Sequence, residues 1–207
     1  MSKIGLYYEV ILRDMDGKVV KRFKRKSESW LRGFIAILRA LMMQRYGAAV
    51  SYANITDETG TSRGYPDVYA PSGSVTYYLP CCNGDTGDTS QGIVVGSSDV
   101  ANDINTYALG SKISHGTGSG QLVYNAMIFE DISNPSAGVL QFRLTRSFTN
   151  NSGADITVKE MGLLAKGKDN TDNPRSFLIA RDVLTTPITI PDGYSLTLRY
   201  IVKITVA

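Results

Sequence analysis

The chain has few of the residues that most often carry chemistry: two cysteines, one tryptophan and one histidine among 207 residues. Cys81 and Cys82 are adjacent, and a disulfide between neighbours strains the peptide between them, so we expect two reduced thiols. Because His115 is the only histidine, no four-ligand zinc pattern can be assembled. Long apolar runs are absent too: the stretch 34–43 is interrupted by Arg39 and is too short to cross a bilayer. The N-terminal residues have no long apolar core, so we expect neither a signal peptide nor a membrane partner.

The excess of positive over negative charge is also small. The net charge is +3, far below that of a dedicated nucleic-acid binder, which argues against nucleic acid as a partner. Most of the excess falls in one segment that contains Lys18, Lys21, Arg22, Lys24, Arg25 and Lys26. We interpret this segment as the solvated face of a strand. The alternative is a docking patch for an acidic partner or nucleic acid.

The shortage of acid–base groups argues against an enzyme. A Ser-His-Asp site would have to use His115, but the glycine-rich residues 116–120 contain no nucleophile elbow on a strand-to-helix turn. The same residues are not followed by Lys-Ser/Thr, so they are no phosphate loop. Glu130, Asp131 and Glu160 are the strand-borne carboxylates, and nothing marks a pair of them for glycoside hydrolysis. We predict no catalytic residue and no cofactor.

Four aspartates form the densest group of hard oxygen ligands, namely Asp85, Asp88, Asp99 and Asp103. Oxygen ligands of this kind suit Ca²⁺, but their spacing matches no known calcium loop. We interpret them as turn residues in solvent, and calcium binding stays open as the alternative.

Twelve tyrosines and 20 glycines favour strands joined by tight turns. Residues 3–13 and 18–25 alternate as a β-hairpin, with a turn at 14–17 in which Gly17 supplies a positive φ. Seven further strands are predicted at 92–96, 107–114, 121–131, 138–149, 155–165, 176–184 and 194–206. Alternation indicates one face on a core and one in water. The predicted fold is mainly β: an antiparallel, jelly-roll-like β-sandwich with an N-terminal hairpin and one amphipathic helix.

The helix is predicted at 28–45, capped by Ser27 or Ser29. Its apolar stripe contains Trp30, Leu31, Phe34, Ile35, Leu38 and Leu41 or Met42. We interpret the stripe, led by Trp30 and Phe34, as core or as a contact with the next subunit.

Three parts are expected within one structural domain. They are an N-terminal hairpin and helix packed on the main domain (1–46), a long ordered excursion with one or two short strands (47–91), and the sandwich (92–207). The excursion is rich in tyrosine, and Tyr65, Tyr69, Tyr77 and Tyr78 are candidate subunit contacts or a platform for sugar. Arg181 and Asp182 interrupt an apolar strand. A charged pair there suits a subunit contact or an edge protected against wrong pairing.

Three segments together resemble small virion proteins of tailed bacteriophages and related viruses of microbes. They are the helix entry at 26–34; Gly92–Gly96 with 107–113, 115–118 and 120–122; and a C-terminal run at 156–163, 178–184 and 187–198. In those proteins such a C-terminal run closes a β-rich domain. The resemblance implies no catalytic residue.

The expected function is therefore that of a virion structural protein of the tail, neck or capsid surface, made in the host cytoplasm and located in the virion. Its expected partners are copies of itself and other virion proteins. The alternative is a receptor- or carbohydrate-binding module, for which the tyrosine-rich segment is the only support.

Overall fold

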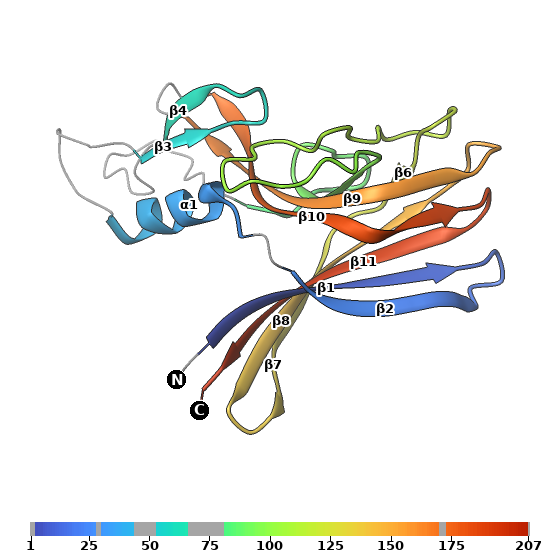
Figure 1. Cartoon of the computed structure of the whole chain (residues 1–207), viewed down its shortest axis with the longest axis horizontal. Coiled ribbons are helices and arrows are strands. Elements are labelled where there is room, and N and C mark those ends of the chain that lie inside the picture. Colours follow the sequence, from blue (N-terminus) through green and yellow to red (C-terminus); the bar gives the residue numbers. More distant parts are fainter. Residues whose placement is uncertain (1–2, 28–29, 44–52, 66–80, 170–172, 207) are drawn as a thin grey trace.

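The computed structural model describes residues 3–27, 30–43, 53–65, 81–169 and 173–206. It confirms a mainly β protein whose antiparallel sheets form a sandwich-like fold (Figure 1). The larger sheet, sheet A, has the strand order β2-β1-β11-β8-β6, with β7 also paired to β8. Its strands are β1 (Lys3–Arg13), β2 (Val19–Ser27), β6 (Val123–Tyr124), β7 (Ile128–Ser136), β8 (Val139–Thr149) and β11 (Ser195–Thr205).

The smaller sheet, sheet B, has the order β10-β9-β5. It contains β5 (Gly92–Gly96), β9 (Ile156–Lys168) and β10 (Pro174–Ile190). A separate hairpin of β3 (Ala53–Thr56) and β4 (Ser62–Tyr65) lies beside the helix α1 (Arg32–Met43), which contacts β3 and β10. This hairpin falls within the predicted excursion 47–91, and most of the remainder of that segment is outside the described residues.

The predicted N-terminal hairpin is part of the sandwich itself. β1 lies between β2 and β11, and its pairing with β11 runs over its whole length, from Lys3–Thr205 to Arg13–Ser195. The turn before β2 has Gly17 at φ 78°, as the sequence predicts. The described part of the 1–46 segment therefore contributes two of the strands of sheet A.

The core lies between the two sheets. Inward side chains of β1 and β11 alternate with outward ones, because successive residues of a strand point to opposite faces. The inward residues of sheet A that are buried include Leu6, Tyr8, Val10, Leu12, Leu144, Phe148, Leu196, Leu198 and Tyr200. Strands β5 and β9 are buried along almost their entire length, because loops and α1 also cover sheet B.

The predicted helix start is wrong. Ser27 is the last residue of β2 and its hydroxyl donates to Asp182, so it caps no helix; α1 begins at Arg32. The predicted stripe is wrong in part as well, since Ile35 and Leu38 are exposed while Ile37 is buried. A Cβ on Gly33 would collide with the carbonyl oxygen of Leu178. The helix therefore approaches β10 most closely at the face that carries the glycine.

The predicted strand at 107–114 is also wrong. These residues form a loop on the outer side of sheet B, with a single bridge between Lys112 and Gly96. Leu109 and Ile113 are buried, so the apolar spacing that imitates a strand comes from a loop with inserted side chains. The single strand predicted at 121–131 is wrong as well, because it is divided into β6 and β7 and β7 continues to Ser136. The remaining strands of this half are found near their predicted positions, and β10 continues six residues beyond its predicted end at 184.

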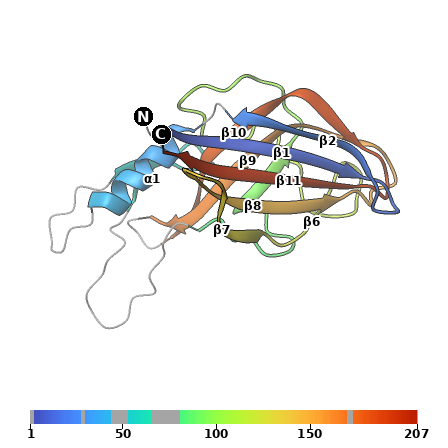
Figure 2. The ribbon, with the colours of Figure 1, turned by 90° about the horizontal axis from the view of Figure 1, so that it is seen from below.

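One end of sheet A extends past sheet B. In Figure 1 the ends of β1, β11, β8 and β7 near the chain termini diverge from β9, β10 and α1. Figure 2 views the sandwich from below, where the outward face of sheet A is uncovered. The diverging end and the uncovered face are the two surfaces with functional potential.

Candidate functional site

The diverging end of sheet A carries a row of exposed apolar side chains. The pairing register places Ile4 opposite Ile204, and Ile204 opposite Leu140, on three adjacent strands. Phe129 of β7 lies opposite the core residue Leu144, so it points to the same face, four residues nearer the core than this row. Their exposed fractions are 68%, 38%, 47% and 46% in the order Ile4, Ile204, Leu140, Phe129. We call these four residues, with the nearby exposed Ile132 and Val206, the apolar end.

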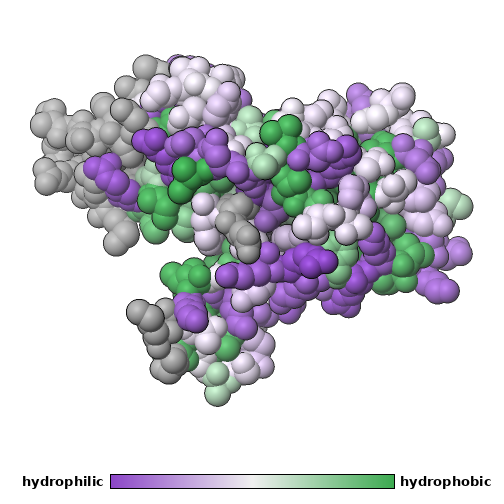
Figure 3. Space-filling model, viewed as in Figure 1, coloured by the Kyte–Doolittle hydropathy of each residue, from purple (hydrophilic) through white to green (hydrophobic). Residues whose placement is uncertain are grey.

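The apolar end continues the inward face of the sheet. Moving along the strands from the core, Leu6 is buried, Val202 and Phe142 are half-buried, and the row at Ile4 is exposed. Side chains that face the core elsewhere therefore lose their cover where sheet B turns away. Figure 3 shows an open notch between α1 and this end of sheet A, with hydrophobic surface on the strand side.

The backbone edge is open at the same place. β2 pairs with β1 only from Leu6 onward, so the residues 3–5 have no partner strand on that side in the described structure. Unpaired amide and carbonyl groups of an edge are a template for pairing with another chain. An apolar face beside a free edge is an arrangement suited to association.

The buried charges serve a different purpose. Arg181 and Glu160 form an ion pair at 2.6 Å with exposed fractions of 2% and 0%. Glu160 also accepts from the backbone amides of Ser98, Gly110 and Ser111. The pair therefore fastens the loop 97–111 onto β9 and β10, as a buried carboxylate requires partners for its lone pairs.

Asp182 lies within the sandwich as well. Its carboxylate accepts from the hydroxyls of Ser27 (2.9 Å) and Tyr200 (3.1 Å). Burial, together with the nearby carboxylate, raises the pKa of Tyr200 well above its usual 10.0. The prediction that Arg181 and Asp182 make a subunit contact is therefore not supported by their placement, because both side chains are engaged inside the chain.

Arg146 is a buried cation that sequence reasoning missed. Its side chain is fully buried, donates to the carbonyl oxygens of five residues and lies 4.9 Å from the centroid of the Tyr124 ring. The acceptors are Asp85, Asp88, Gln91, Ile93 and Asn125. An available signal was the charged residue at an inward position of an alternating strand, between Leu144 and Phe148.

The aromatic candidates are only partly placed. Trp30 precedes α1, bridges to Ala180 and stacks on Phe34 with 3.9 Å between ring centroids. Both are half-buried against the chain's own core, and a role in subunit contact stays a prediction. Tyr65 is the last residue of β4, while Tyr69, Tyr77 and Tyr78 lie outside the described residues.

The four aspartates do not converge. Asp88 accepts from the amide and hydroxyl of Ser90, Asp99 pairs with Lys159, and Asp103 accepts from the amide of Asn105. Within the described ranges, no group of three or more His, Cys, Asp or Glu side chains is placed to hold a metal. The structure thus shows Asp88 and Asp103 as turn residues.

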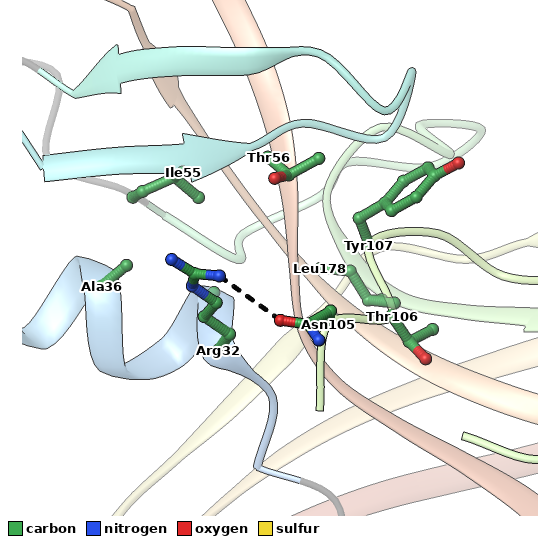
Figure 4. Close-up of a pocket in the computed structure, with 9 residues that line it drawn as sticks. Arg32, Ala36, Ile55, Thr56, Asn105, Thr106, Tyr107 and Leu178 are labelled. Atoms are coloured by element: carbon green, nitrogen blue, oxygen red, sulfur yellow. Dashed lines mark hydrogen bonds between the residues drawn. The ribbon is translucent and has the colours of Figure 1, made fainter. Parts of the chain in front are cut away.

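His115 and the cavities offer no obvious reaction centre in the described part of the chain. The Nδ1 of His115 accepts the amide of Tyr124, which occupies it structurally. A cavity of about 430 Å³ between α1, β3 and the loop at 105–107 is shown in Figure 4. Its charged lining residue, Arg32, points toward Asn105 and donates to it at 3.4 Å. None of the lining residues is a carboxylate, histidine or cysteine.

Comparisons of the chain with protein families, curated proteins and solved structures found no match. None of the helices among the described residues has the length and apolar character needed to span a membrane. The surface geometry and the sequence resemblance are therefore the basis of the functional inference.

Proposed function

We propose that this protein is a structural component of a tailed-virus particle that works by association with copies of itself. The observation that carries the proposal is the apolar end of sheet A, where an inward-type face and a free strand edge are exposed together. Large exposed apolar patches on soluble proteins mark interaction sites. A particle component needs such a surface, because it folds first and then buries part of its surface against its neighbours.

The strength of the contact follows from its size. The exposed fractions of the six side chains in the apolar end add up to about three fully exposed side chains. Burying them in a contact contributes roughly 5–9 kcal/mol. Association costs about 4–15 kcal/mol in lost freedom of motion and ordering. One such contact is therefore weak. A closed ring in which each subunit makes two contacts is much more stable, since the last contact forms within one assembly.

The placement of the buried charges supports an assembly role over catalysis. Arg146, Arg181 and Glu160 are satisfied by backbone groups and by each other, and they hold loops in fixed positions. Fixed loops and a rigid sandwich suit a part that must present the same surface in every copy. The resemblance of the C-terminal run to virion proteins points in the same direction.

The alternative of a carbohydrate-binding module has no described site. Three of the four tyrosines on which it depends, Tyr69, Tyr77 and Tyr78, lie outside the described residues. No specific observation favours it, so it is kept as an outcome to be tested by a glycan array.

Sedimentation velocity of the full chain over a wide concentration range tests self-association. We expect larger species to increase with concentration, and Ile4→Gln to weaken them about tenfold or more. Val100→Gln is the matched control, because Val100 is 67% exposed, like Ile4 at 68%, but lies in the loop that covers sheet B. A chain that stays monomeric at every concentration, or a control that weakens association equally, contradicts the proposal.

The location in a particle needs a separate test. Imaging of intact virus particles with a tagged copy of the chain should show the tag at repeated, symmetric positions. Particles that lack the tag altogether would remove the virion part of the proposal and leave self-association standing.

A further inference from the structure

The outward face of sheet A is strongly cationic. The register aligns Lys24 of β2 with Glu9 of β1 and Arg199 of β11 in one row across the sheet. The next row contains Lys26, Tyr7, Ile201 and Arg143. Apart from Arg13 at the far end of β1, the outward lysines and arginines of these four strands form what we call the cationic face; they are Lys3, Arg22, Lys24, Lys26, Arg143, Arg199 and Lys203.

The charge of the chain is segregated onto this face. The seven cations are accompanied by two outward carboxylates, Glu9 and Glu130, which leaves a surplus of five positive charges. The whole chain has a surplus of only three, so the remainder has a net charge of −2. A modest total charge therefore conceals a concentrated positive surface.

Arginines and lysines divide the face between them. The arginines form a network: Arg22 and Arg199 bind Glu9 at 2.8 and 2.9 Å, and Arg143 binds Glu130 at 2.8 Å. Burial alone would raise the pKa of Glu9, but hydrogen bonds from the two arginines outweigh it and lower the pKa. Lys3, Lys24, Lys26 and Lys203 make no ion pair with any described carboxylate. These four charges are available to a partner.

The four lysines are arranged around one aromatic ring and one strand edge. The Nζ atoms of Lys24 and Lys203 lie 5.3 and 5.9 Å from the centroid of the Tyr7 ring. Lys24 and Lys26 are separated by about 6.7 Å along β2, the two-residue repeat of a strand. At the edge of the sheet, Lys24, Arg25 and Lys26 also line a groove of about 840 Å³ between β2 and β10, whose other side carries Asp99 and Asp182.

The chemistry of this face is unlike that of a protein-binding surface. The core of a protein–protein interface is poor in charge and rich in apolar side chains, whereas nucleic-acid interfaces are polar and positive. Among the described residues, the outward positions of β1 and β11 carry no exposed large hydrophobic side chain. Lysine ammonium groups on flexible stems act as point charges, which suits a phosphate backbone of variable geometry.

We propose that the cationic face binds the phosphodiester backbone of nucleic acid without reading its sequence, through Lys3, Lys24, Lys26 and Lys203. This surface lies on the opposite side of sheet A from the apolar end, so the two can be occupied together. The proposal does not depend on the virion assignment.

Fluorescence anisotropy with a labelled duplex, and with a single strand of the same length, tests the proposal. Four phosphate contacts predict a slope of log K against log salt of about −3.6 for the duplex and about −2.8 for the single strand. Duplex affinity should therefore fall about a hundredfold between 50 and 200 mM salt. The duplex and single-strand arms establish which form of the backbone fits the face.

The variant Lys24→Gln/Lys26→Gln should reduce the slope by about 1.8 in the duplex experiment, because two contacts are lost. Lys112→Gln/Lys166→Gln is the matched control: it removes the same charge from lysines that bind Glu58 and the hydroxyl of Ser90, away from the cationic face and its groove. The control should leave the slope unchanged.

Three results would overturn the proposal. They are the absence of binding at 50 mM salt, an equal loss in the two double variants, and polyglutamate binding as tight as the nucleic acid. The last result would assign the face to an acidic protein.

Discussion

Replacement of Arg146 by methionine should destabilise the protein more than any other single loss of charge in sheet A. Methionine keeps an unbranched stem of similar length but removes every donor of the guanidinium. The side chain is fully buried, and its five carbonyl partners come from two separate segments of the chain, 85–93 and the region of Asn125.

The magnitude follows from two opposing effects. Each hydrogen bond to a charged group contributes about 1.5–3 kcal/mol, and buried carbonyls left unpaired cost more. Against this, folding of the variant no longer has to desolvate a cation, which recovers several kcal/mol. The balance resembles the removal of one partner from a buried ion pair, about 3–5 kcal/mol. Burial already lowers the pKa of Arg146, in agreement with a desolvated guanidinium held by neutral acceptors.

Urea unfolding measures this loss, with Arg143→Met as the control. Arg143 is three residues away on the same strand, but its side chain is 39% exposed and pairs with Glu130 on the surface. Exposed pairs of this kind contribute about 0.2–1 kcal/mol. A loss below 1 kcal/mol in Arg146→Met, at an unchanged m-value, would refute the inference that this residue organises the loop at 85–93.

Three further predictions concern acid stability, thiol reactivity and packing. The folded-state pKa of Glu9 lies below its ordinary value of 4.5, so the stability that Glu9 contributes is present above pH 4.5 and is lost as the pH falls through the folded-state pKa. Glu9→Gln should therefore reduce the loss of stability towards low pH in a series of urea-unfolding experiments. An unchanged pH dependence would refute the pKa shift. Burial, with a smaller effect of Cys81, raises the pKa of Cys82 to about 12. A thiol reagent at pH 8 should therefore label the exposed Cys81 quickly and Cys82 only after unfolding. Equal labelling rates for the two thiols in the folded protein would contradict this prediction. Gly96→Ala should lower the free energy of unfolding by about 1–3 kcal/mol, because its Cβ would meet the Glu160 carboxylate. Gly17→Ala is the control: the space around Gly17 is open, so the loss should be no more than the strain of its positive φ. Equal losses in the two variants, measured by thermal or urea unfolding, would count against the tight packing at Gly96.

The regular part of the fold was predictable because it obeys one simple period. Alternation of apolar and polar residues located β8 and β11 to within about a residue at each end, and the glycine at position 17 identified the first turn. The same rule failed at 107–114, where buried Leu109 and Ile113 come from a loop. Period alone cannot distinguish a paired strand from a loop whose backbone amides bind a carboxylate such as Glu160.

The candidate surfaces were less accessible to sequence reasoning. Ile4, Leu140 and Ile204 continue the inward pattern of their strands, and nothing in that pattern indicates where the second sheet ends. The basic segment 18–26 was visible in the sequence, but Lys203 and Arg199 join it only through the pairing of β1 with β11. Conversely, the Arg181–Asp182 pair had a signal that pointed to the surface, whereas its partners Glu160 and Tyr200 bring it inside.

Hydrogen exchange of the full chain, measured at low and high protein concentration, tests the assembly role of the apolar end most directly. If copies associate there, the backbone amides of residues 3–5, 139–141 and 203–206 should exchange more slowly at high concentration. The turn at 14–17, at the other end of sheet A, serves as the internal reference and should not change. Exchange that is independent of concentration at residues 3–5 and 203–206, or protection confined to the turn, would contradict association through the apolar end.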